Sequence, residues 1–206
     1  MDIVLKAELV AVTAHDAVGQ KRKFTGEPYW THPQKVADVV AQRQDDHMYF
    51  QYYDWDLVAA AWLHDVVEDT QISQDFIVKH FGPDIAQFVF DVTEQNVYGP
   101  KSQNALHEIN RLSKVCDKSK FLKLCDIYCN VSDICVESGE QFIGAWVPTK
   151  IATVLAIGNE SPMFQGFGKD ILDVIETKIK SVYPTLDYGK LFKEAMSRLE
   201  KAKGLS

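Results

Sequence analysis

Residues 57–69 read LVAAAWLHDVVED and predict a buried helix. The first seven are all apolar, so a helix built from them has no polar face to turn toward solvent. Residues 54–56 (DWD) supply short acidic side chains that cap free backbone N–H groups, so we expect the helix to begin there and to continue to Asp69. The buried helix therefore ends in an imidazole and three carboxylates.

Ionisable side chains at the end of a buried helix are costly unless something satisfies them. At 3.6 residues per turn, Glu68 lies one turn beyond His64 and Asp65. Asp69 lies one turn beyond Asp65. A divalent metal would satisfy this cluster, because imidazole and carboxylate together suit an ion such as manganese or iron. The alternative is an exposed acidic helix end with His64 as an ordinary capping histidine, but the apolar run before it favours the metal.

One helix cannot complete a metal site, so further ligands must come from other parts of the chain. One candidate is His32, which stands where a loop meets a helix in GEPYWTHP (residues 26–33). Another is Asp126 in KLCDIYCN (residues 123–130), because a bare carboxylate among core-like neighbours needs a partner. Asn130 lies one turn further along, on the same face.

Most of the remaining chain is also predicted to be helical, because apolar residues recur at helical spacing and no run alternates as a strand does. The expected helices cover residues 2–18, 33–44, 73–81, 84–95, 103–116, 118–137, 148–158, 169–182 and 187–203. Pro33 and Pro148 are each expected in a first helical turn, where the missing N–H does no harm. Residues 158–168 are rich in Gly, Asn, Ser and Pro and predict a loop. The sequence thus predicts an all-α protein with a single domain over residues 1–206.

Composition narrows the class of protein. The chain has 206 residues, is 46% hydrophobic and carries a net charge of −7, which suits one globular domain and argues against broad electrostatic binding to DNA or an anionic membrane. No apolar run approaches the roughly 20 residues of a membrane helix, and residues 1–6 do not resemble a signal peptide. The four cysteines fall within residues 116–135 without a CxxC pair, so neither a disulfide framework nor a zinc ribbon is expected. The classes of protein that remain are a cytoplasmic enzyme and a cytoplasmic binding protein.

The order of His32, His64-Asp65 and Asp126 resembles that of the HD-domain metal-dependent phosphohydrolases. The likeness is closer to the RelA/SpoT-type (p)ppGpp hydrolase domains, and to the small stand-alone hydrolases among them that include metazoan SpoT homologues. The matching stretches are RK (22–23), GEPY (26–29), HP (32–33), AAWLHDVVEDT (60–70), FG (81–82), VT (92–93) and KLCD (123–126) with Asn130. The resemblance covers about residues 7–157. It implies a compact HD-domain helical bundle, to which residues 164–206 add extra C-terminal helices.

The same resemblance implies a site and a reaction. The implied ligands of one divalent metal, usually manganese in the family, are His32, His64, Asp65 and Asp126. Glu68 and Asp69 would orient and activate the attacking water, whose pKa a metal lowers and whose proton a carboxylate accepts. The implied substrate contacts are Arg22, Lys23 and Thr25 near the base and phosphates, Tyr29 near the substrate pocket, and Asn130 near the ribose or phosphate. The family removes the 3′-pyrophosphate of ppGpp or pppGpp, the alarmones of the stringent response, giving GDP or GTP.

The sequence also departs from the family. Ile127 and Ser132 replace arginines that are common there, which changes the local support around Asp126. Phe24 or Thr25 is inserted in the loop, so the base pocket can differ. Other substrates stay open, namely an adenosine alarmone, the 2′-phosphate of NADPH or a pyrophosphorylated RNA end, as does a non-catalytic domain that binds a nucleotide or a partner protein. Residues 164–206 predict a packing helix or, alternatively, an oligomer contact.

Overall fold

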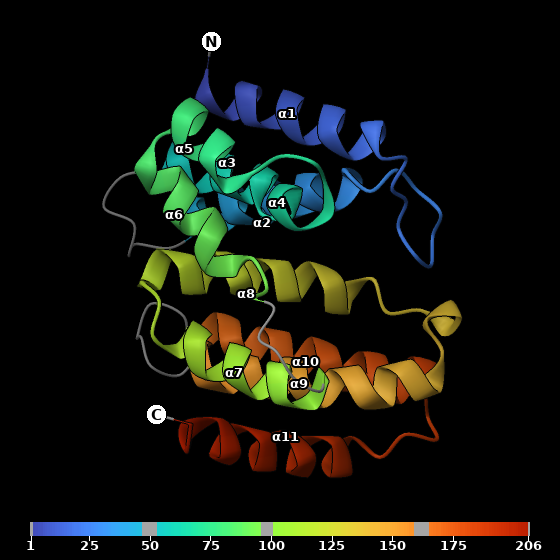
Figure 1. The fold of residues 1–206 in the computed structure, drawn as a ribbon. Helices are drawn as coiled ribbons and strands as arrows, with labels where there is room; N and C mark the ends of the chain where they lie inside the picture. The colour runs from blue at the N-terminus through green and yellow to red at the C-terminus, as the bar shows by residue number, and fades with distance from the viewer. Residues whose placement is uncertain (1, 47–52, 96–100, 159–164, 206) are drawn as a thin grey trace. The chain divides into compact units, whose positions relative to one another are not determined.

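The computed structural model describes residues 2–46, 53–95, 101–158 and 165–205. Within these ranges the regular elements are helices, with a single isolated β-bridge between Lys21 and Pro28 (Figure 1). The predicted all-α class is confirmed. The chain divides into two compact units, Met1–Thr93 and Glu94–Ser206. Each is described by itself, and the single domain expected over the whole chain stays a prediction.

The first unit is built around the predicted apolar helix. Its elements are α1 (Ile3–Ala17), α2 (Thr31–Asp46), α3 (Trp55–Leu63), α4 (Val66–Asp69), α5 (Gln74–Phe81) and α6 (Pro83–Val92). The α3 helix packs against α1, α2 and α6, and every residue from Leu57 to Leu63 is buried. The Asp54 carboxylate accepts a 3.0 Å hydrogen bond from the Leu57 N–H, so the predicted cap is present.

The helix expected to continue to Asp69 is interrupted, and that prediction is wrong. The α3 helix ends at Leu63 and α4 begins at Val66, with His64 and Asp65 in the turn between them. No Gly or Pro marks the break. The His64 ring instead contacts the Ala61 carbonyl oxygen, 2.7 Å from Nδ1. Side-chain bonds of this kind compete with the backbone hydrogen bonds of a helix. His64 and Asp65 therefore lie at a corner and not along one helical edge.

The second unit is organised around α9. Its elements are α7 (Lys101–Ser113), α8 (Asp117–Ser132), the 3₁₀ turn η1 (Val136–Ser138), α9 (Glu140–Gly158), α10 (Gln165–Val182) and α11 (Tyr188–Lys203). The α9 helix packs against α7, α8, α10 and α11. Pro148 lies inside α9 and not in its first turn, which corrects the expected start at residue 148. An interior proline costs about 3 kcal/mol, and burial of Ile143, Val147 and Ile151 in the same helix offsets that cost.

By length and composition, α9 could cross a membrane. No uninterrupted apolar run of this length is present in the sequence, because Thr149 and Lys150 divide the apolar residues. Within the structure 56% of the apolar window is buried. Since four other helices of the same unit pack against it, α9 has the surroundings of a core helix.

The C-terminal helices belong to the core of the second unit. Both α10 and α11 pack against α9, as expected for packing helices. Tyr183 at the end of α10 donates its hydroxyl proton to the carbonyl oxygens of Cys135 and Val136. A Cβ added to Gly158 would lie 3.3 Å from the Cα of Gly168, so α9 and α10 approach closely. Of the loop predicted over residues 158–168, residues 159–164 lie outside the described part, and α10 begins earlier than predicted, at Gln165.

Candidate metal centre

Three of the predicted ligands converge within the first unit. His32 lies in the first turn of α2, and His64 and Asp65 form the corner between α3 and α4. Both imidazoles are 1% exposed, and their ring centroids are 5.1 Å apart. The Asp65 Oδ2 atom lies 3.1 Å from His64 Nε2 and 3.6 Å from His32 Nε2. Asp65 thus lies at the break after α3, and its carboxylate faces both rings.

The hydrogen bonding of His64 fits a metal ligand. A carbonyl oxygen only accepts, so His64 Nδ1 carries the hydrogen in its contact with Ala61, and in the neutral imidazole Nε2 then presents a lone pair to Asp65 Oδ2. Two electron-rich atoms 3.1 Å apart need a cation or a proton between them. Two atoms bound to one ion at about 2.1 Å lie about 3.0 Å apart when the bonds meet at a right angle. The donor atoms of His32, His64 and Asp65 therefore fit a shared divalent ion.

A supporting layer lies behind Asp65. The Tyr29 hydroxyl donates a 2.8 Å hydrogen bond to Asp65 Oδ2. The Tyr29 ring packs against His15, with 4.9 Å between the ring centroids, and His15 Nδ1 lies 2.7 Å from Gln20 Oε1. Burial lowers the pKa of His15, against the smaller opposing effects of Gln20 and of the carboxylates of Asp65 and Asp69, so this imidazole is neutral at pH 7.

Neither His15 nor Gln20 belongs to a motif of the sequence, and His15 is expected to be a surface or satisfied histidine and not a ligand. A signal for His15 was present, because Ala7, Ala11 and His15 recur every four residues and form the buried stripe of α1. The stripe places His15 in the core. It does not reveal that Tyr29 is its neighbour, because that contact joins α1 to the loop before α2.

The two predicted catalytic carboxylates lie on α4. Glu68 is exposed, whereas Asp69 is half-buried. Asp69 is near enough to His15 for its charge to raise the pKa of that imidazole, and its backbone N–H donates to the Asp65 carbonyl at 2.9 Å. The α4 helix thus follows directly from the corner that carries the predicted metal ligands His64 and Asp65. The catalytic roles of Glu68 and Asp69 stay predictions.

The cationic loop before α2 is closed on itself. The Arg22 N–H donates to the Glu27 carbonyl at 2.8 Å, and Gly26, with φ of +73°, donates back to the Arg22 carbonyl at 2.9 Å. The Arg22 guanidinium lies over the Tyr29 ring, 5.7 Å from its centroid. Lys23 and Thr25 are exposed, and the Thr25 hydroxyl donates to Glu27 at 3.2 Å. Arg22 is therefore linked through Tyr29 to Asp65, a predicted metal ligand, while the expected substrate contacts of this loop stay predictions.

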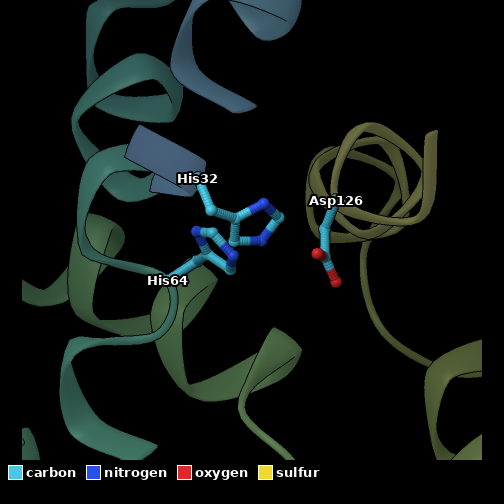
Figure 2. A group of neighbouring side chains, drawn as sticks. All are labelled: His32, His64 and Asp126. Atoms are coloured by element: carbon cyan, nitrogen blue, oxygen red, sulfur yellow. The ribbon is translucent and has the colours of Figure 1, made fainter. Parts of the chain in front are cut away.

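Asp126, the remaining predicted ligand, is held by its own helix in the second unit. Figure 2 shows its carboxylate projecting from α8. Asp126 is buried, accepts a 2.6 Å hydrogen bond from Asn130 Nδ2 at Oδ1, and pairs with Lys123 Nζ at 2.8 Å through Oδ2. These two neighbours supply the local support that the missing arginines had put in question. Asn130, expected near substrate, thus also contacts Asp126.

Comparison with known proteins places the chain in a family. A model of the HD domain matches residues 8–118 of the 206. The chain belongs to the HD-domain family. Among its relatives, a guanosine-3′,5′-bis(diphosphate) 3′-pyrophosphohydrolase of Haemophilus influenzae is 40% identical over 86 residues, which are 42% of this chain and 11% of that protein. The Mus musculus enzyme of the same name, called MESH1, is 30% identical over 135 residues, which are 64% of this chain and 72% of that protein.

A solved structure supports the fold. A protein described as a metazoan ortholog of SpoT that hydrolyzes ppGpp superposes with a TM-score of 0.70 at 22% identity, over 84% of this chain and 95% of its own. The chain spans only 10–18% of the length of the first curated relatives that it matches. The predicted HD-domain fold is therefore confirmed. The activity of the whole protein stays a proposal.

Proposed function

We propose that this protein is a metal-dependent hydrolase that removes the 3′-pyrophosphate from ppGpp or pppGpp, giving GDP or GTP and pyrophosphate. The observation that carries the proposal is the convergence of His32 Nε2 and His64 Nε2 on Asp65 Oδ2, with the Nδ1 hydrogen of His64 directed to the Ala61 carbonyl. The names of the relatives that share these motifs support the choice of substrate.

The proposed metal is one Mn²⁺ ion. His32, His64 and Asp65 would hold it, and we propose Asp126 as the fourth protein ligand, on the strength of its motif, its burial and its charge. When bound, such an ion lowers the pKa of a water ligand and polarises a phosphoryl oxygen. Imidazole and carboxylate donors with no thiolate suit manganese better than the softer metals.

The remaining chemistry falls to side chains of the chain itself. Glu68 is the proposed general base: it is exposed on α4, so a water molecule can reach it and give up its proton. Asp69, half-buried on the same short helix, orients that water. Arg22 binds a substrate phosphate through its planar fork of N–H donors. The further proposed substrate contacts are Lys23, Thr25 and Asn130.

We propose that the protein works in the cytoplasm, binds a nucleotide and binds neither DNA nor a membrane. The net charge of −7 supports the last point, because it opposes broad binding to nucleic acid or an anionic surface. A strongly anionic substrate then depends on local positive charge. Residues 21–23 (KRK) and the metal supply that charge. A homo-oligomer is compatible with this proposal and is tested by light scattering.

The decisive experiment is Mn²⁺-dependent turnover of ppGpp with the products resolved by anion exchange. We expect GDP and pyrophosphate, loss of turnover with a chelator, and restoration when Mn²⁺ is returned. Glu68→Gln keeps the shape of the side chain but cannot accept a proton, so we expect turnover to fall by about 10²–10⁴-fold with Mn²⁺ affinity unchanged. Turnover of Glu68→Gln at the wild-type rate would show that another group is the base.

A protein that binds Mn²⁺ and leaves ppGpp intact would contradict the choice of substrate. The assay then turns to an adenosine alarmone, NADPH and pyrophosphorylated RNA. Release of orthophosphate would indicate the NADPH reaction, whereas release of pyrophosphate from an adenosine alarmone would indicate a different base pocket. Nucleotide binding without turnover of any of these would indicate a non-catalytic domain.

A further inference from the structure

Tyr29 lies in the loop before α2, and its hydroxyl is directed to a proposed metal ligand. It donates a 2.8 Å hydrogen bond to Asp65 Oδ2. The same oxygen lies 3.1 Å from His64 Nε2 and 3.6 Å from His32 Nε2. Tyr29 therefore holds the one carboxylate oxygen on which both imidazoles converge.

The position of the Tyr29 ring is set by Gln20 in two ways. The Gln20 carbonyl accepts a 3.1 Å hydrogen bond from the Tyr29 backbone N–H. The Gln20 side chain bonds to the His15 imidazole at 2.7 Å, and that imidazole packs on the Tyr29 ring. Because both the backbone and one face of the ring are anchored, the hydroxyl has little freedom to turn away from Asp65.

The Tyr29 ring also contacts the cationic loop. The Arg22 guanidinium lies 5.7 Å from the ring centroid, within the range of a cation–π contact. The loop that carries Arg22 is closed by its own backbone hydrogen bonds to Glu27 and Gly26, so the guanidinium is presented from a restricted position. One residue thus contacts the proposed phosphate-binding cation through its ring and a proposed metal ligand through its hydroxyl.

We infer that Tyr29 is a positioning residue that joins the two halves of the site: its hydroxyl orients Asp65 for the divalent ion, and its ring places Arg22 for the substrate phosphates. The inference rests on the proposed function and deepens it. It replaces the direct substrate contact expected for Tyr29 with a supporting role. Outer partners that orient a metal ligand are typically worth about 10–100-fold in metal affinity.

The test separates the hydroxyl from the ring. Tyr29→Phe removes only the hydroxyl, so we expect Mn²⁺ affinity, measured by calorimetry without substrate, to weaken by about 10–100-fold. The KM for ppGpp at saturating Mn²⁺ should stay at the wild-type value, because Arg22 keeps its aromatic neighbour. Tyr29→Leu removes the ring as well and should weaken Mn²⁺ binding and also raise KM. Tyr53→Phe is the matched control, since Tyr53 packs on Trp55 at the opposite end of α3, and it should change neither quantity.

Each alternative result has a distinct meaning. Wild-type Mn²⁺ affinity in Tyr29→Phe would overturn the inference and leave the metal centre standing. A raised KM with unchanged Mn²⁺ affinity would likewise overturn it and return Tyr29 to direct substrate contact. A wild-type protein that binds no divalent ion would overturn the metal centre and this inference together. Circular dichroism and the thermal midpoint establish that each variant is folded before it is compared.

Discussion

Two carboxylates, one in each unit, are held in opposite ways. Asp65 lies where a helix breaks, and its partners come from three places: the loop before α2, the first turn of α2 and the end of α3. Asp126 lies within α8, and its partners Lys123 and Asn130 stand three residues before it and four after it on the same helix. The arrangement around Asp126 is local and follows from helical spacing. The arrangement around Asp65 exists only when the first unit is folded.

Asp65 and Asp126 also differ in how the protein compensates their negative charge. Lys123 lies against Asp126 with both side chains largely buried, so the protein itself compensates that carboxylate. Asp65 Oδ2 faces two imidazole nitrogens, and neutral imidazoles would not compensate its charge. On the proposed function, the divalent ion compensates Asp65, whereas Lys123 compensates Asp126. Three substitutions test this contrast.

The largest effect is expected at Asp65. Asp65→Asn keeps the shape of the side chain and can still accept from Tyr29, but it removes the negative charge that faces both imidazoles. We expect Mn²⁺ affinity to fall by more than the roughly 100-fold that a lost outer partner costs, and turnover of ppGpp to disappear with it. Calorimetry and the turnover assay measure the two losses. Asp75→Asn, at an exposed position in the first turn of α5, is the control. Turnover that persists in an Asp65→Asn protein without Mn²⁺ would contradict the metal mechanism.

A smaller effect, on stability, is expected at Lys123. Lys123→Met keeps most of the side-chain volume and leaves the buried Asp126 carboxylate without its cation, so the free energy of unfolding should fall by about 1–3 kcal/mol. If Asp126 is a metal ligand, Mn²⁺ takes over the lost compensation, and the rise in thermal midpoint on adding Mn²⁺ should exceed that of the wild type. Lys118→Met, exposed on the same helix, is the matched control. An equal or smaller rise in Lys123→Met would speak against Asp126 as a ligand.

The smallest effect is expected at Asn130. Asn130→Ala removes the 2.6 Å hydrogen bond to Asp126 Oδ1 while Lys123 remains, so the free energy of unfolding should fall by about 1 kcal/mol. Urea unfolding measures the change. If instead the KM for ppGpp rises while stability is unaltered, Asn130 acts mainly on substrate, which would sharpen the contrast by making the support of Asp126 depend on Lys123 alone.

Much of the framework could be predicted because it depends on local patterns. The apolar run at residues 57–63 predicted a buried helix, and the cap at Asp54 is present as expected. Two of the boundaries that were predicted wrongly have different causes. The break at His64 comes from a side chain that bonds to a backbone carbonyl, and the passage of α9 through Pro148 comes from burial of its neighbours. Neither cause is visible in the usual signals of Gly and Pro.

The sequence by itself determined the chemical inventory of this protein: the helical class, the HD-domain motif order, the histidines and carboxylates proposed as ligands, and the place of Asn130 one turn beyond Asp126 on the same helix. The tertiary structure decided how those groups in the first unit meet. It turned His64 and Asp65 at a corner, brought His32 to them, and placed His15 and Tyr29 behind Asp65. Such contacts join residues far apart in the chain, and packing of the helices brings them together, not the spacing along any one of them.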